Sequence, residues 1–271
     1  SDCLVGSEMC IRDSTKSFNT SVHGTPMYSL DNSYSLEDLK EWEKRIKKII
    51  DSPVEYTCEL KFDGVSINLT YKDGELLRAV TRGDGVKGDD VTCNVKTIPT
   101  VPLKLRENIT GEFEARGEIV MPLDGFNQLN KKRTENGEEP FKNPRNTASG
   151  SLKLQDSKEV SERPLECLLY SVEDPKLFNN HIQFLENAKS FGFNIYDNYK
   201  CSSSLDEIFE FIEYWEKNRS NLPFEIDGVV LKVNDFYQRE VLGFTSKFPR
   251  WAMAYKFKPE NTATRLNSIS F

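Results

Sequence analysis

The segment from Glu59 to Thr81 reads ELKFDGVSINLTYKDGELLRAVT, and its pattern decides the fold class. Apolar and polar residues alternate from Val65 to Lys72, which is the period of a half-buried strand. Asp73-Gly74 is a tight hairpin signal, and the residues that follow predict a second strand that returns antiparallel. The segment therefore predicts a β-hairpin.

Helical patterns lie on both sides of this hairpin. Ser35 to Asp38 has the pattern of a capping box and precedes apolar residues spaced three and four apart. A second such box at Ser204 to Glu207 precedes another amphipathic stretch. We predict further strands over 112–121, 165–172, 226–233 and 252–257, helices after Pro122 and over 184–191, and a polar loop over 136–147. The fold class expected from this mixture is α+β, with antiparallel sheets flanked by helices.

Composition limits the classes of protein to which the chain can belong. Its 271 residues include 29% charged and 37% hydrophobic residues, which is ordinary for a soluble protein of one large or two modest domains. We see neither an apolar run long enough to span a membrane nor a secretion signal, so we expect a cytoplasmic protein without membrane contact.

Charge and cysteine content exclude two further kinds of site. A net charge of −7 argues against a nucleic-acid coat over the whole chain, although a locally basic groove remains compatible with it. The six cysteines include no C-x-x-C pair, and the two histidines add few ligands, so we expect free thiols and no zinc site.

The candidate chemistry begins at Lys61 and Asp63. On an extended segment, side chains two residues apart lie on the same face, and Gly64 allows close approach of backbone or ligand. A lysine becomes a nucleophile when burial or neighbouring cations depress its pKa. On its own, however, this motif fits a surface Lys-Asp pair beside a glycine turn equally well.

Other charged residues extend this candidate site. The glycines within 81–94 suit a loop that closes on a phosphate or sugar, or alternatively a solvated turn. Lys232 and Lys256 each interrupt apolar strand-like sequence, where one lysine alone is usually an outward-facing residue. Together with Lys61 and Arg82, they would form a cationic cage that holds a phosphate and keeps one amine neutral.

This ordered series resembles the covalent nucleotidyltransferases, which comprise DNA ligases, RNA ligases and messenger-RNA capping enzymes. The matching segments are Lys61 to Gly64 for the first motif, Glu118 for the third, Asp227 to Lys232 for the fourth and Lys256 for the fifth. The resemblance implies a nucleotidyltransferase (ATP-grasp-like) domain.

Flanking residues narrow the resemblance to NAD-dependent DNA ligases of bacterial type. The segments similar to that family are Pro26 to Asn32, the TRGDG run from Thr81 and Asn143 to Leu152, and the resemblance extends from about residue 18 to the C-terminus. Ser66 stands where relatives that use ATP or GTP usually carry arginine. An ATP-dependent transferase and a catalytically silent nucleotide- or DNA-binding module remain the alternatives.

The resemblance implies that Lys61 attacks the α-phosphate of NAD, releases nicotinamide mononucleotide and passes AMP to a 5′-phosphate at a DNA nick. The implied catalytic residues are Lys61, Asp63, Lys232 and Lys256. The implied cofactor-binding residues are Ser29, Leu30, Glu59, Lys61, Arg82, Glu118, Tyr170, Asp227, Lys232 and Lys256. Tyr170 would stack on the base, although an ordinary core aromatic residue is nearly as good an interpretation. The implied metal is a transient Mg²⁺ ion only.

The implied contacts to nicked double-stranded DNA are Arg145, Lys153 and Arg219, and Lys153 departs from the more usual arginine. We expect residues 1–16 to be a non-native or disordered tail, 17–261 to be the adenylation domain and 262–271 to begin a truncated OB-fold. The expected protein is a monomeric fragment that binds adenine nucleotide, reacts poorly with NAD and does not seal nicks efficiently alone.

Overall fold

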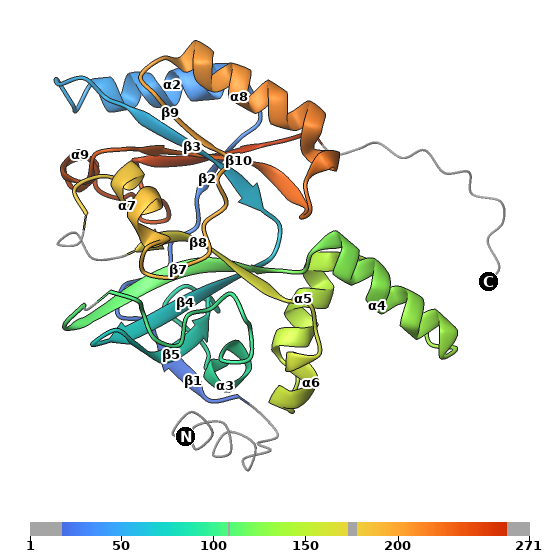
Figure 1. Cartoon of the computed structure of the whole chain (residues 1–271). Helices are drawn as coiled ribbons and strands as arrows, with labels where there is room; N and C mark the ends of the chain where they lie inside the picture. Colours follow the sequence, from blue (N-terminus) through green and yellow to red (C-terminus); the bar gives the residue numbers. More distant parts are fainter. Residues whose placement is uncertain (1–17, 108, 173–177, 259–271) are drawn as a thin grey trace, which may run out of the picture.

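The computed structural model describes residues 18–107, 109–172 and 178–258 of the chain. These residues form two principal sheets that lie one above the other, with helices on their outer faces (Figure 1). The α+β fold class is confirmed. The predicted tail over 1–16 and the predicted OB-fold segment over 262–271 lie outside the described residues.

The upper sheet has five strands in the order β2-β11-β10-β3-β9. Its strands are β2 (Asp31–Ser33), β3 (Tyr56–Phe62), β9 (Tyr199–Ser202), β10 (Ile226–Val233) and β11 (Ala252–Lys256). Neighbouring strands are antiparallel, except that β11 pairs with β2 in parallel. The predicted antiparallel sheets are confirmed, and the parallel pairing of β2 with β11 is a further feature of this edge.

Two helices, α2 (Leu36–Lys47) and α8 (Leu205–Asn218), cover the outer face of this sheet (Figure 1). Ser35 caps α2, since its side chain accepts a hydrogen bond from the amide of Asp38 at 3.2 Å. Apolar side chains of both helices, including Trp42 and Ile212, join the core beneath them. Ser204 precedes α8 but makes no side-chain capping bond, so the second predicted capping box does not form.

The lower sheet has four antiparallel strands in the order β5-β4-β7-β8. Its strands are β4 (Val65–Lys72), β5 (Glu75–Thr81), β7 (Glu112–Val120) and β8 (Glu166–Val172), and a two-stranded sheet of β1 (Thr20–Val22) and β6 (Lys87–Asp89) accompanies it. The predicted hairpin is confirmed: Asp73 and Gly74 have φ values of 49° and 80°, the left-handed backbone that such a turn requires.

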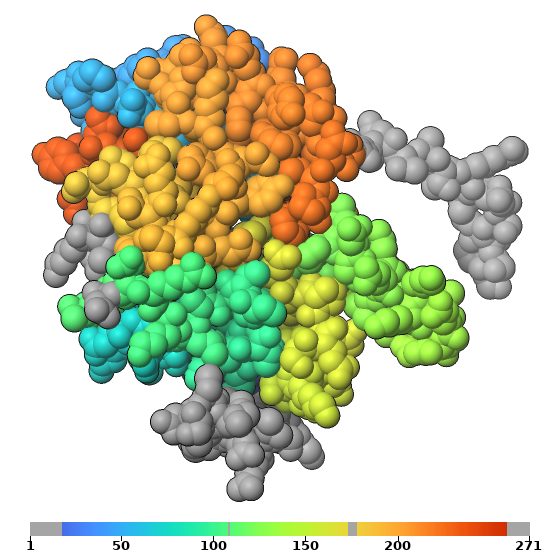
Figure 2. Space-filling view, viewed as in Figure 1, coloured from blue at the N-terminus to red at the C-terminus, as the bar shows by residue number. Residues whose placement is uncertain are grey.

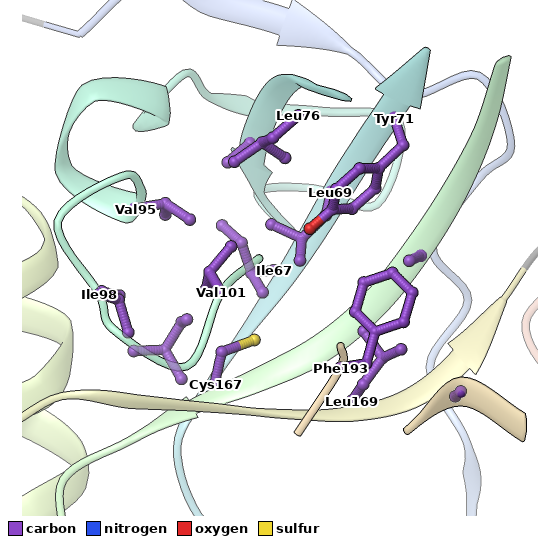
Figure 3. Close-up of a cluster of buried hydrophobic side chains, with 14 of the residues drawn as sticks. Ile67, Leu69, Tyr71, Leu76, Val95, Ile98, Val101, Cys167, Leu169 and Phe193 are labelled. Atoms are coloured by element: carbon purple, nitrogen blue, oxygen red, sulfur yellow. The ribbon is translucent and has the colours of Figure 1, made fainter. Parts of the chain in front are cut away.

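The alternation read from the sequence places one face of β4 in the core of the lower sheet. Ile67, Leu69 and Tyr71 point into the same cluster of buried side chains as Cys167 and Phe193 (Figure 3). Buried apolar side chains from residues 91–105 and 178–195 complete this cluster. Each sheet therefore has its own apolar core. A third, smaller cluster of Val120, Leu168 and Phe224 packs against Phe62 of the upper sheet.

The remaining helices lie mainly around the lower sheet. They are α3 (Thr92–Val95), α4 (Leu123–Glu135), α5 (Pro144–Leu152), α6 (Ser157–Ser161), α7 (His181–Ala188), the 3₁₀ helix η1 (Arg219–Asn221) and α9 (Phe236–Leu242). The loop predicted over 136–147 is wrong at its end, because Asn143 caps α5 and Pro144 occupies its first turn. The space-filling view shows the orange C-terminal segments meeting the green and yellow central segments along the boundary of the two layers (Figure 2).

One short connection joins the two sheets. Only Asp63 and Gly64 separate β3 of the upper sheet from β4 of the lower sheet. A side chain at Gly64 would place its Cβ 2.3 Å from the carbonyl oxygen of Ile119, so glycine is required for this close passage. The turn brings the end of β3, with Lys61, to the boundary between the sheets.

Candidate functional site

A cleft of about 660 Å³ lies between the two sheets. Side chains of β3, β10 and β11 form its upper wall, and side chains of β4, β5, β7 and β8 form its lower wall. The segment from Thr25 to Leu30 and the helix α5 contribute to its rim. A cleft between separately packed layers, lined by convergent charged groups, is the usual setting of a small-molecule site.

Three adjacent strands bring two lysines together in this cleft. Gly228 of β10 pairs with Lys61 of β3 on one side and with Lys256 of β11 on the other. Lys61 Nζ lies 3.2 Å from Asp227 Oδ1, and Lys256 Nζ contacts Oδ2 of the same carboxylate. A single carboxylate therefore holds two ammonium groups next to each other.

The surroundings of Lys61 shift its protonation equilibrium toward the neutral amine. Burial lowers the pKa of Lys61 below its ordinary value, the charge of Asp227 opposes this shift, and the neighbouring charge of Lys256 adds to it. The side chain still keeps 26% of its surface exposed, so that a ligand in the cleft can reach it. These are the conditions under which a lysine serves as a nucleophile.

A second charged group lies further along β3. Glu59 is 8% exposed and its Oε1 lies 2.9 Å from Lys232 Nζ and 2.7 Å from His181 Nε2. Burial acts to raise the pKa of Glu59, but the neighbouring His181 and Lys232 hold it at about 2, so the carboxylate is ionised. Lys232 also donates to the carbonyl oxygen of Tyr170 at 2.9 Å.

Glu118 has the opposite electrostatic environment on the lower wall. Burial raises the pKa of Glu118 to about 7, although the hydrogen bond from Ser66 and the charges of Lys61 and Arg145 act against the shift. Ser66 Oγ donates to Glu118 Oε2 at 2.7 Å. Glu59 thus remains ionised, whereas Glu118 titrates near neutrality.

Side chains of β7 hold the N-terminal segment at the rim of the cleft by hydrogen bonds. The backbone amides of Gly24 and Thr25 donate to the carboxylate of Glu114 at 2.8 and 2.9 Å. Arg116 donates to the carbonyl oxygens of Thr25 and Pro26 at 2.9 and 3.2 Å. This anchored segment continues into Ser29 and Leu30, both of which line the cleft.

The structure brings most of the predicted site residues together. Those that line the cleft are Ser29, Leu30, Glu59, Lys61, Asp63, Arg82, Glu118, Arg145, Lys153, Tyr170, Lys232 and Lys256. Asp227 joins them through its contacts with Lys61 and Lys256. Arg219 is not among the lining residues and lies instead with its guanidinium carbon 5.9 Å from the centre of the Phe257 ring.

Sequence reasoning missed three polar residues of the site. His181 contacts Glu59, and Glu114 and Arg116 anchor the N-terminal rim. His181 begins α7 without a recognisable motif around it, so no sequence signal indicated its role. Glu114 and Arg116 alternate with apolar residues of β7 and resemble ordinary outward-facing strand residues, whereas both are only 8% exposed.

The described part of the chain contains neither a cluster of metal ligands nor a helix suited to span a membrane. No group of three or more His, Cys, Asp and Glu side chains there could hold a metal ion. Among the helices of residues 18–107, 109–172 and 178–258, none combines the length and the apolar character that a membrane span requires.

Comparison with known proteins identifies the family. Residues 15–260 match the sequence profile of the NAD-dependent DNA ligase adenylation domain. The chain is 55% identical over 258 residues to a DNA ligase of Christiangramia forsetii and 56% identical over 259 residues to a DNA ligase of Flavobacterium psychrophilum. Each alignment covers 95% of this chain and 39% of the relative, so the chain spans about two fifths of the length of these relatives.

An archaeal ATP-dependent RNA ligase of known structure has a TM-score of 0.45 and 12% sequence identity to this chain, and the match covers 84% of this chain and 47% of that one. The family assignment rests on the sequence matches alone, both on the profile that covers most of the chain and on relatives with more than half of their aligned residues identical. This chain belongs to the NAD-dependent DNA ligase adenylation domain family.

Proposed function

We propose that this chain carries out the first step of DNA ligation, in which Lys61 takes AMP from NAD. The observation that supports the proposal most directly is the partly buried Lys61 amine beside Asp227 and Lys256 in the cleft. The neutral amine attacks the α-phosphorus, a nitrogen–phosphorus bond forms and the bridging phosphorus–oxygen bond breaks. Nicotinamide mononucleotide leaves with the bond electrons, and the amine loses one proton.

The groups around Lys61 have separate tasks in this proposal. Lys256 and Lys232 stabilise the negative charge that builds on the phosphate oxygens. Asp227 keeps Lys61 and Lys256 in place, whereas Lys232 is held beside Glu59. Glu59, Ser29 and Leu30 bind the adenine, and Tyr170 stacks on it. Arg82, Glu118 and Asp63 contact the ribose and the rest of the nucleotide.

We propose that Mg²⁺ assists at the phosphate. Asp63 and Asp227 are candidate carboxylate ligands near Lys61, and each would have to exchange a contact with a basic side chain for one with the ion. Mg²⁺ commonly binds through one or two carboxylates together with substrate phosphates, which fits this limited set. The ion would supply charge neutralisation at the phosphate.

The later steps involve DNA, and we propose nicked double-stranded DNA as the partner of the whole protein. Arg145 and Lys153 lie at the rim of the cleft, where a 5′-phosphate would receive AMP from Lys61. In the chain alone both side chains are paired, Arg145 with Asp63 at 2.5 Å and Lys153 with Asp89 at 2.7 Å. Arg219 would contact DNA at a distance from the cleft. We also propose residues 17–261 as one adenylation domain, acting as a monomer in the cytoplasm.

The test is the intact mass of the purified chain after incubation with Mg²⁺ and NAD, and separately with Mg²⁺ and ATP. We expect an AMP adduct that forms slowly with NAD and is absent in Lys61→Ala. An adduct with ATP alone would support the ATP-dependent alternative instead. If the adduct persists in Lys61→Ala, Lys61 is not the nucleophile. If neither cofactor gives an adduct although AMP binds, the chain alone is a nucleotide-binding module.

A further inference from the structure

His181 is a buried polar side chain to which the proposed chemistry gives no task. It begins α7 with 1% of its surface exposed. Its backbone amide donates to the carbonyl oxygen of Asn234 at 2.9 Å, and the side chain of Asn180 caps the helix. The ring lies between Phe184 and Phe236, with ring centres 5.2 and 6.5 Å away. The imidazole is thus fixed in position by backbone and by packing.

The short contact with Glu59 determines which ring nitrogen carries the proton. His181 Nε2 lies 2.7 Å from Glu59 Oε1, and at that separation the nitrogen has to donate to the carboxylate. Lys232 Nζ lies 3.2 Å from the same nitrogen, but its hydrogens have better acceptors in Glu59 Oε1 and the carbonyl oxygen of Tyr170. Burial lowers the pKa of His181 to about 3, so the ring is neutral with its proton on Nε2.

Both contacts of Glu59 use the same oxygen. His181 and Lys232 both reach Oε1, and no hydrogen bond from the described residues goes to Oε2. Glu59 also lines the cleft. The carboxylate therefore has one oxygen held by the protein and a second that is available to a donor on a bound ligand.

We propose that His181 is a positioning residue that orients the Glu59 carboxylate so that the cleft selects a purine with an amino group over one with an oxo group. This inference rests on the proposed binding of adenine at Glu59. An exocyclic amino group donates to the available Oε2, whereas an oxo group would place a second acceptor against an ionised carboxylate. A site built for a donor rejects an analogue that lacks it, because a buried polar group then remains unpaired.

His181 and Lys232 act on the Glu59 carboxylate in different ways. Lys232 supplies the charge that keeps Glu59 ionised, and its flexible side chain allows the carboxylate to rotate. The rigid imidazole supplies a single donor at a fixed point. Without it, either carboxylate oxygen could turn toward Lys232, and the acceptor facing the ligand would lose its fixed direction.

The test compares binding of AMP and GMP by calorimetry to the wild-type chain and to His181→Ala, His181→Gln and Glu186→Ala. Glutamine retains a donor of similar reach, and Glu186 is an exposed residue of the same helix, so the last variant is the matched control. We expect His181→Ala to weaken AMP binding by about 10- to 100-fold and GMP binding far less, so that the preference for AMP falls. His181→Gln should keep most of that preference, and Glu186→Ala all of it.

Two binding results would overturn the inference. One is an unchanged ratio of AMP to GMP affinity in His181→Ala, which would reduce His181 to a structural residue. The other is a folded His181→Gln variant that loses the ratio as completely as His181→Ala does.

The protonation state of His181 can be measured without any bound nucleotide, so this test does not depend on the proposed function. The chain has two histidines, so nitrogen-15 spectra of labelled histidine are simple to assign with a His23→Gln variant. We expect His181 to be neutral with the proton on Nε2 between pH 5 and 8, and Glu59→Gln to shift its Nε2 signal. A wild-type chain that bound neither nucleotide would contradict the proposed function. A proton on Nδ1 would contradict the positioning inference whatever the binding data.

Discussion

Lys61 and Lys256 lie on strands that do not pair with each other, yet both bind the carboxylate of Asp227, which belongs to the strand between them. The arrangement holds two like charges together by means of one opposite charge. The pKa of Lys61 depends on the balance between the attraction to Asp227, the repulsion from Lys256 and the burial of the side chain.

Asp227→Asn should shift the pH dependence of adduct formation to lower pH. Asp227 raises the pKa of Lys61 against the effects of burial and Lys256, so its removal lowers that pKa further. The amine is then neutral at lower pH, while the maximal rate falls because the two lysines lose their common anchor. The rate of AMP adduct formation between pH 5 and 9 gives the midpoint.

The control for this prediction is Asp197→Asn, which removes an exposed carboxylate paired with Lys189. Its pH profile should match that of the wild type. A midpoint in Asp227→Asn that stays constant or rises would contradict the electrostatic account of Lys61.

Glu59 and Lys232 should show strong coupling in a double-mutant cycle. Their contact is buried, with side-chain exposures of 11% and 8%, and removal of one partner leaves the other charge uncompensated. We expect Glu59→Gln and Lys232→Met each to cost about 3–5 kcal/mol of unfolding free energy in urea. The double variant should be more stable than the sum predicts by about 1–3 kcal/mol. Strict additivity would show that the pair contributes no mutual stabilisation.

Glu118→Gln should stabilise the chain at pH 8 more than at pH 5. The pKa of Glu118 is raised from 4.5 to about 7 in the folded protein, so the folded state binds its proton more tightly than the unfolded state. Unfolding free energy therefore falls as the pH rises from about 4.5 to 7, and glutamine removes this loss. The gain at pH 8 should be at most about 3 kcal/mol, measured by urea unfolding.

The matched variant for that measurement is Ser66→Ala, which removes the donor to Glu118 and leaves the carboxyl group in place. Because this hydrogen bond lowers the pKa of Glu118, its loss should extend the pH-dependent region upward. A Glu118→Gln variant whose stability relative to the wild type is the same at both pH values would contradict the raised pKa.

Gly64→Ala and Gly150→Ala should have opposite effects on stability. A Cβ at Gly64 would meet the backbone carbonyl of Ile119 at 2.3 Å, and the backbone there has to shift, which we expect to cost about 1–3 kcal/mol. A Cβ at Gly150 meets nothing within 4 Å inside α5, so alanine should stabilise the helix by about 0.5–1 kcal/mol. Melting temperatures of the two variants give the comparison, and a stable Gly64→Ala variant would contradict the close passage between the sheets.

The sequence predicted those parts of the fold that have local signals. The β4–β5 hairpin was predicted from a period of two and an Asp-Gly turn, and α2 from a capping box that Ser35 does form. The parallel pairing of β2 with β11 joins segments more than two hundred residues apart in the chain, and no local pattern indicates it. The capping box at Ser204 did not form, since a sequence pattern does not determine which side chain reaches the amides.

In the candidate site, too, only the residues within recognisable motifs were predicted from the sequence. Lys61, Glu118, Asp227, Lys232 and Lys256 were assigned by family resemblance, and the structure places them in or beside one cleft. Their roles remain predictions. His181 was not predicted because its partner Glu59 is 122 positions away in the sequence, and no local pattern indicates a contact over that distance. The same holds for Glu114, whose partners Gly24 and Thr25 are 90 and 89 positions away.

The contacts of Glu114 and Arg116 have a consequence for the order of folding. The rim segment from Gly24 to Pro26 obtains these hydrogen bonds only from β7, so it cannot take its final path before the lower sheet has formed. We therefore expect the cleft to be completed late in folding, by contacts that close loops of about ninety residues. A nucleotide that binds this cleft would recognise only the finished domain, so its binding energy would add to the stability of the whole fold.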